Sequence, residues 1–142
     1  MSEWLTLAVA KPPAKSVASG VVSLDELTVR VLVDNVTDSL STVPSGVLNE
    51  SATLLANGNL REAAGEYRCC AEHGLSLVIT ARVGETTHTV VFDAGPEAYA
   101  VTRNGALLNV PFKDVDGVVL SHGHWDHAGG LVEVIRQAAG VV

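Results

Sequence analysis

Alternating apolar and polar positions predict three β-strands in the first hundred residues. In residues 28–34 every second position is valine, which is typical of a strand with one buried face. Residues 75–83 alternate in the same way, and a further apolar run covers residues 88–93. The last two runs predict an antiparallel hairpin with a loop of about four residues.

Helical spacing follows in the second half of the chain. Pro96 followed by Glu97 is typical of the start of a helix, and this helix is expected to run to Leu108. Residues 131–138 place apolar side chains at i, i+3, i+4 and i+7, the pattern of an amphipathic helix. A short helix is also predicted over residues 60–70.

Two further segments complete the expected order of strand, hairpin, helix, strand and helix. Residues 117–120 are an unbroken apolar run, which indicates a strand buried on both faces that ends beside His122. Residues 37–59 are polar and too long for a simple connection, so we expect them to reach over a site. The predicted organisation is an extension over residues 1–22 and one α/β domain over residues 23–142.

Charge and composition narrow the class of protein. The formal net charge of −7 and the lack of a Lys/Arg cluster argue against a nucleic-acid partner and favour a small-molecule substrate. No signal peptide or membrane-length apolar run is recognisable, so no membrane partner is expected. Cys69 and Cys70 are adjacent, which makes a disulfide between them strained; we expect reduced thiols and a cytoplasmic location.

The candidate chemistry lies in the run from His122 to His127. His122 and His124 are spaced to present two imidazoles to one ion, with Gly123 allowing close passage of the backbone. Asp126 and His127 offer an oxygen and a nitrogen to a second ion. The alternative is a polar turn in which Asp126 caps a helix and the histidines are solvated. We expect Trp125 to pack beside the site or to line a pocket.

This donor set predicts two divalent metal ions, Zn in the first place and Mn or Fe as alternatives. A hydroxide bridging two such ions is a nucleophile at neutral pH, and the ions polarise an ester, thioester, amide or phosphoryl oxygen. The remaining histidines, His73 and His88, are expected to be ordinary surface or hydrogen-bonded residues.

Residues 118–131 resemble the metal-binding motif of the metallo-β-lactamase-fold metallohydrolases. Residues 31–35, 72–76 and 91–95 fall in the order seen in one branch, the 7,8-dihydropterin-6-ylmethyl-4-(β-D-ribofuranosyl)aminobenzene 5′-phosphate synthase group. The resemblance implies an αββα sandwich, of which this chain would be the amino-terminal half, and a substrate that is phosphorylated or pterin-like.

The same resemblance assigns roles to individual residues. It implies that His122 and His124 bind the first metal and that Asp126 and His127 bind the second. Because Asp126 would belong to the second metal, we expect it to be needed for catalysis. The resemblance also implies that Asp93 orients a metal-bound imidazole. The alternative for Asp93 is a turn-capping aspartate before Gly95.

The chain departs from the family pattern in one respect. A further histidine, a bridging aspartate and a last histidine come from the second half of the family's domain, and Val142 precedes any counterpart. We therefore expect a metal-dependent hydrolase, or a related pterin transferase, in the complete protein. The alternative is a truncated, non-catalytic half-domain that binds metal weakly. The chain of residues 1–142 is expected to self-associate or to need a completing carboxy-terminal half.

Overall fold

The computed structural model describes residues 21–38 and 40–140. Most of the predicted extension, residues 1–20, lies outside these described residues, so its separation from the domain stays a prediction. Within the described ranges, no helix combines the length and apolar character that crossing a bilayer requires.

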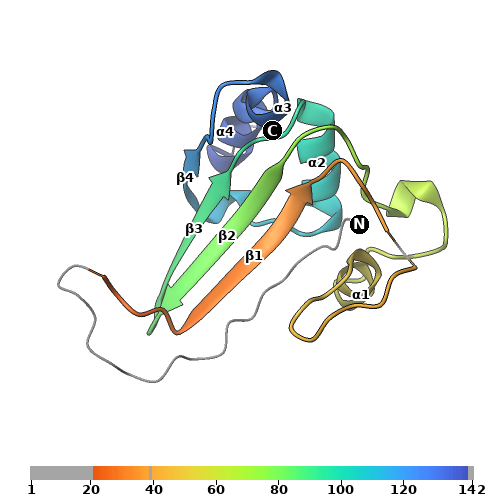
Figure 1. The fold of residues 1–142 in the computed structure, drawn as a ribbon, viewed down its shortest axis with the longest axis horizontal. Helices are drawn as coiled ribbons and strands as arrows, with labels where there is room; N and C mark the ends of the chain where they lie inside the picture. The colour runs from red at the N-terminus through yellow and green to blue at the C-terminus, as the bar shows by residue number, and fades with distance from the viewer. Residues whose placement is uncertain (1–20, 39, 141–142) are drawn as a thin grey trace.

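The described chain is built on one four-stranded mixed sheet (Figure 1). Its strands are β1 (Glu26–Val33), β2 (Ser76–Val83), β3 (Thr86–Phe92) and β4 (Val115–Val119), in that spatial order. Strand β2 pairs antiparallel with both β1 and β3, whereas β4 lies parallel to β3. The predicted α/β class is confirmed.

The predicted hairpin is present, but its loop is shorter than expected. Val83 pairs with Thr86 and Arg82 with Thr87, so only Gly84 and Glu85 lie between the strands. Gly84 has a φ of 56°, a conformation that glycine adopts without a steric penalty. Because the two threonines are β-branched, they extend the strand instead of the turn.

Two of the predicted helices cover one face of this sheet. Helix α2 (Ala98–Leu107) begins after Glu97, which takes an extended conformation and stands at the N-cap. Helix α4 (Leu131–Ala138) has the predicted bounds of the amphipathic repeat. Val78 and Val91, which pair across β2 and β3, lie in one buried cluster with Val101 of α2 and Val134 of α4.

The opposite face of the sheet is apolar and carries no helix of the described residues. Val29, Ile79 and Val90 are successive register partners on this face, and each remains partly accessible to solvent. Phe92 and Val119 continue the face onto β4. The burial of β4 was therefore predicted wrongly: it is the edge strand of the described sheet, and Val119 is 50% exposed.

The long polar segment does not reach over the histidine run. It contains helix α1 (Glu50–Ala56), whose N-cap Asn49 accepts a hydrogen bond from the Ala52 N–H. The helix is held beside the end of α2, where the Asn57 amide donates to the Leu107 carbonyl at 2.9 Å. In Figure 1, α1 and the histidine-bearing α3 lie in different parts of the molecule.

The helix predicted over residues 60–70 is reduced to a single 3-10 turn, Gly65–Tyr67. The reason is that side chains from elsewhere bind the backbone groups that a longer helix needs. The N–H of Cys69 donates to Glu50 at 2.6 Å, and the N–H of Cys70 donates to the Asn104 side chain at 2.9 Å. Asn104, which is fully buried, also donates to the Leu32 and Cys70 carbonyls. Tertiary bonds replace the local ones.

Candidate metal centre

The end of β4 places the histidine run at one edge of the sheet. After Val119 the chain continues to His124, which is the N-cap of the short helix α3 (Trp125–Ala128). The backbone N–H groups of His127 and Ala128 both donate to the His124 carbonyl, at 3.1 and 2.9 Å. This tight turn folds Asp126 and His127 back toward His122, as strand-end placement of the motif leads one to expect.

Three of the four predicted ligands come together in one group. One donor atom from each of His122, Asp126 and His127 lies within 4.8 Å of the others. The His122 and His127 rings have their centroids 4.3 Å apart, and His127 Nε2 is 3.4 Å from Asp126 Oδ2. Two imidazoles and one carboxylate therefore converge before any ion is added.

His124 lies next to this group but is not a member of it. Its ring centroid is 4.5 Å from that of His122, and the side chain is exposed. The structure thus groups His122 with Asp126 and His127, whereas the sequence paired His122 with His124. Which residues share an ion stays a prediction, and so does the second ion itself.

Asp93 lies beside this group of residues and supports it. It directly follows β3, has no exposed surface, and adopts a φ of 57°, a left-handed conformation that aspartate tolerates better than most residues. Its Oδ2 lies 2.7 Å from His127 Nδ1. The N–H of Gly95 is bound by the Leu75 carbonyl, so the carboxylate is directed to the histidine and does not cap the following turn.

The ionisation of Asp93 follows from these contacts. Burial acts to raise its pKa, but three hydrogen bonds outweigh burial and hold the pKa below its ordinary value. The Ser121 N–H donates at 2.7 Å, the Ser121 hydroxyl at 2.8 Å, and His127 provides the third bond. Asp93 is therefore a carboxylate that accepts from the imidazole and fixes its orientation.

Ser121 is a functional neighbour that the sequence reasoning missed. Its hydroxyl donates to Asp93 and lies 3.0 Å from His122 Nδ1. Because the hydroxyl proton is used on Asp93, His122 Nδ1 acts as the donor to this oxygen. The available signal was its position, directly after the strand and directly before the first histidine.

Close packing of three loops holds the centre in place. Ala94 N–H donates to the His127 carbonyl at 2.7 Å, and Leu75 N–H to the Asp126 carbonyl at 3.3 Å. A Cβ at Gly74 would collide with the Asp126 carbonyl, and one at Gly129 with the Pro96 carbonyl. Gly123, in contrast, has open space around it, so the close passage expected at that glycine is wrong.

The other two histidines differ in their distance from the centre. His88 pairs with Asp116 at 3.2 Å on the surface, in agreement with expectation. His73 is also exposed, yet its Nε2 is 3.7 Å from Asp126 Oδ2. Because His73 stands alone in the sequence, no sequence pattern indicated that it lies next to a candidate ligand.

The donor set fits a divalent transition metal. His122 and His127 both use Nδ1 in hydrogen bonds to Ser121 and Asp93, a tautomer that leaves each Nε2 as a lone-pair donor. Imidazole nitrogen with carboxylate oxygen suits Zn, Mn and Fe. An imidazole held through its other nitrogen by a carboxylate is the usual support of such ligands.

Comparisons with known proteins agree with this geometry. The family model described as the metallo-beta-lactamase superfamily matches residues 72–141. The chain is similar to a 7,8-dihydropterin-6-methyl-4-(beta-D-ribofuranosyl)-aminobenzene-5'-phosphate synthase of Methanocaldococcus jannaschii, with 34% identity over 67 residues. That alignment covers 47% of this chain and 23% of the relative.

An uncharacterized protein of the same organism is 38% identical over 66 residues, which are 46% of this chain and 24% of that protein. The chain thus spans about a quarter of the length of the curated relatives it matches. The matched segment holds β2 to α4 and every residue of the cluster described above. Through residues 72–141, the chain belongs to the metallo-beta-lactamase superfamily.

Proposed function

We propose that this chain carries one part of the metal centre of a metal-dependent hydrolase, or of a related transferase that acts on a pterin substrate. The observation that carries the proposal is the convergence of His122, Asp126 and His127, with His127 held by the buried Asp93. The superfamily match supports the proposal. The transferase stays part of it because one relative is named as a synthase.

Each residue of the centre has a defined task in this proposal. His122, Asp126 and His127 bind the metal, with His124 as a further ligand close by. Asp93 and Ser121 hold the Nδ1 atoms of His127 and His122, which would leave each Nε2 lone pair available to a metal ion. Two divalent ions, when bound, would supply Lewis acidity and a nucleophile at neutral pH. The substrate class is a small molecule that is phosphorylated or pterin-like.

The number of ligands limits what the described residues achieve alone. A catalytic zinc normally keeps three protein ligands and one open position, so the described cluster is sufficient for one ion but not for two. A loosely held second ion would leave the nucleophile poorly positioned, and positioning contributes a large share of catalysis. We therefore propose that a completing segment or a second chain supplies the remaining ligands.

Cellular location is proposed from the cysteines. Cys69 is buried, Cys70 is partly buried, and both are free thiols although they are adjacent. Burial raises the pKa of the Cys70 thiol, and repulsion by Glu72 adds to that effect, so the thiol is unreactive. Unreactive, reduced thiols support a cytoplasmic protein.

The proposal is tested by measuring turnover with and without metal. We expect Zn- or Mn-dependent hydrolysis of a phosphodiester or thioester reporter when residues 1–142 are produced with the carboxy-terminal segment of a relative. Asp126→Ala should abolish this turnover, whereas Asp116→Asn, on the surface pair with His88, should leave it unchanged.

The 142-residue chain by itself should show no appreciable turnover. Robust metal-dependent hydrolysis by that chain would contradict the ligand count given above. Absence of turnover in every completed form, with metal bound, would favour the alternative of a non-catalytic half-domain.

A further inference from the structure

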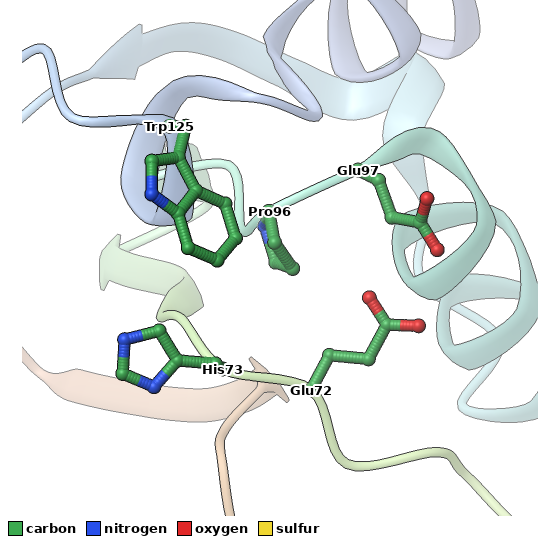
Figure 2. A pocket seen from close by; sticks show the side chains of 5 residues that line it. All are labelled: Glu72, His73, Pro96, Glu97 and Trp125. Carbon is green, nitrogen blue, oxygen red and sulfur yellow. The ribbon is translucent and has the colours of Figure 1, made fainter.

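A hollow of about 460 Å³ opens next to the candidate metal centre. Its lining is Glu72, His73, Pro96, Glu97 and Trp125 (Figure 2). One contact and one chain connection join it to the centre: His73 Nε2 is 3.7 Å from Asp126 Oδ2, and Trp125 directly precedes Asp126 in α3. A molecule in this hollow would therefore lie beside the candidate ligands.

One side of the hollow is aromatic. Trp125 is 64% exposed. Such exposure is unusual for tryptophan, a large side chain that is highly buried on average. The His73 ring lies near it, with centroids 5.7 Å apart and a tilt of 38°. Figure 2 shows Trp125 and His73 on the same side, with Pro96 between the indole and Glu97. An accessible indole face attracts cations through its quadrupole.

The other side of the hollow is acidic. The Glu72 and Glu97 side chains point toward each other in Figure 2. Burial raises the pKa of Glu72, and the charge of the facing Glu97 raises it further. Among the described residues that line the hollow, none is Lys or Arg, so none of them places a guanidinium or ammonium group beside this pair. A bound cation would relieve the repulsion.

We infer that this hollow binds a planar organic cation, an amidinium or guanidinium group. The carboxylates of Glu72 and Glu97 accept hydrogen bonds from its N–H groups, and Trp125 covers its face. That such a group belongs to the substrate rests on the proposed function; the binding itself does not. An anion is disfavoured by the two carboxylates. A metal ion is disfavoured because the hollow is wide and partly lined by the indole and the Pro96 ring, neither of which is a metal ligand.

The test is a calorimetric titration of the metal-free chain with benzamidine, compared with the neutral isostere benzamide. Benzamidine should bind roughly tenfold or more tightly than benzamide, because charge-assisted hydrogen bonds to carboxylates are stronger than neutral ones. Glu72→Gln combined with Glu97→Gln should remove this preference. Trp125→Ala should weaken benzamidine binding roughly 2- to 30-fold.

The matched control is Glu62→Gln combined with Glu85→Gln, which changes the net charge equally at two exposed positions outside the hollow. This control should bind benzamidine like the parent chain. Equal binding of benzamide and benzamidine, or equal losses in both double variants, would overturn the inference. Displacement of benzamidine by equimolar Mg²⁺ would also overturn it in favour of a metal site.

Folding and metal binding do not confound the result. The Gln variants remove a repulsion, so they should keep the circular dichroism spectrum and midpoint of thermal unfolding of the parent. The titration needs no metal and no turnover. A failure of the proposed hydrolase function would therefore leave the benzamidine result unchanged, and a failure here would leave the metal centre standing.

Discussion

Asp93 shows how one buried side chain connects the strands to the site. Its carboxylate accepts hydrogen bonds from the Ser121 backbone, the Ser121 hydroxyl and His127 Nδ1, while its backbone N–H donates to the Val119 carbonyl at 2.8 Å. The end of β3 is thereby fixed to the end of β4 and to α3. A buried carboxylate with these partners stabilises the local fold and sets the direction of the metal-facing nitrogen of His127.

Asp93→Asn should lower the affinity for Zn²⁺ by about 10- to 100-fold, because the amide keeps the shape but loses the charge that orients and polarises His127. The measurement is competition with a chromophoric chelator at constant pH. Asp116→Asn is the matched control, since Asp116 contacts His88 Nδ1 at 3.2 Å on the surface. Equal affinities of both variants would mean that Asp93 acts only as part of the fold.

At the scale of elements, three loops are packed so closely that glycine is required between them. Gly129 ends α3 with a φ of −62° and a ψ of −36°, values that alanine adopts readily. The constraint is therefore contact and not backbone conformation, because an added Cβ would meet the Pro96 carbonyl. The loop after β3 and the helix bearing two candidate ligands touch at this point.

Gly129→Ala should destabilise the fold by about 1–3 kcal/mol, the range expected for overpacking, although alanine is the better helix former. Urea unfolding followed by circular dichroism measures the change. Gly123→Ala, where space is open, should leave the free energy of unfolding nearly unchanged. A neutral or stabilising Gly129→Ala substitution would contradict the close contact between the loop after β3 and α3.

The elements were predictable where local pattern and tertiary environment agree. Alternation located β1, β2 and β3, and helical spacing located α2 and α4, because each has one face in the core. Residues 60–70 lack this agreement: Glu50 and Asn104 bind the backbone of Cys69 and Cys70. No local rule predicts a hydrogen bond between residues so distant in sequence.

The candidate site was predictable in its residues and less so in its arrangement. The spacing of His122 to His127 indicated the candidate ligands, since few other roles require so many histidines together. The grouping of His122 with Asp126 and His127 depends on the tight turn at His124, which spacing does not determine. Ser121 and His73 were missed because their roles arise only from contacts across the fold.

At the scale of the whole molecule, helices cover one face of the sheet, and no helix of residues 21–38 and 40–140 covers the other. Ile79 and its register partners Val29 and Val90 form the centre of the uncovered apolar face. Contiguous apolar surface of this kind is normally hidden by association. The αββα architecture of the superfamily places a second sheet at such a face, in line with the proposed completing segment.

The chain of 142 residues should therefore self-associate in sedimentation velocity experiments. Ile79→Lys should shift the population toward monomer, since the lysine charge resists burial between sheets while its stem still lies along the strand surface. Val132→Lys is the control, because Val132 is 71% exposed on α4 and lies away from the sheet face. A monodisperse monomer of the parent chain would contradict the need for a covering partner.

The central claim is that His122, Asp126 and His127 form a metal centre. It is tested most directly by equilibrium dialysis against Zn²⁺ followed by metal analysis of the parent chain and single alanine variants. The parent should retain zinc, and His122→Ala, Asp126→Ala and His127→Ala should each weaken binding by roughly tenfold or more. His88→Ala should bind like the parent. Equal zinc content in all five proteins would contradict the metal centre.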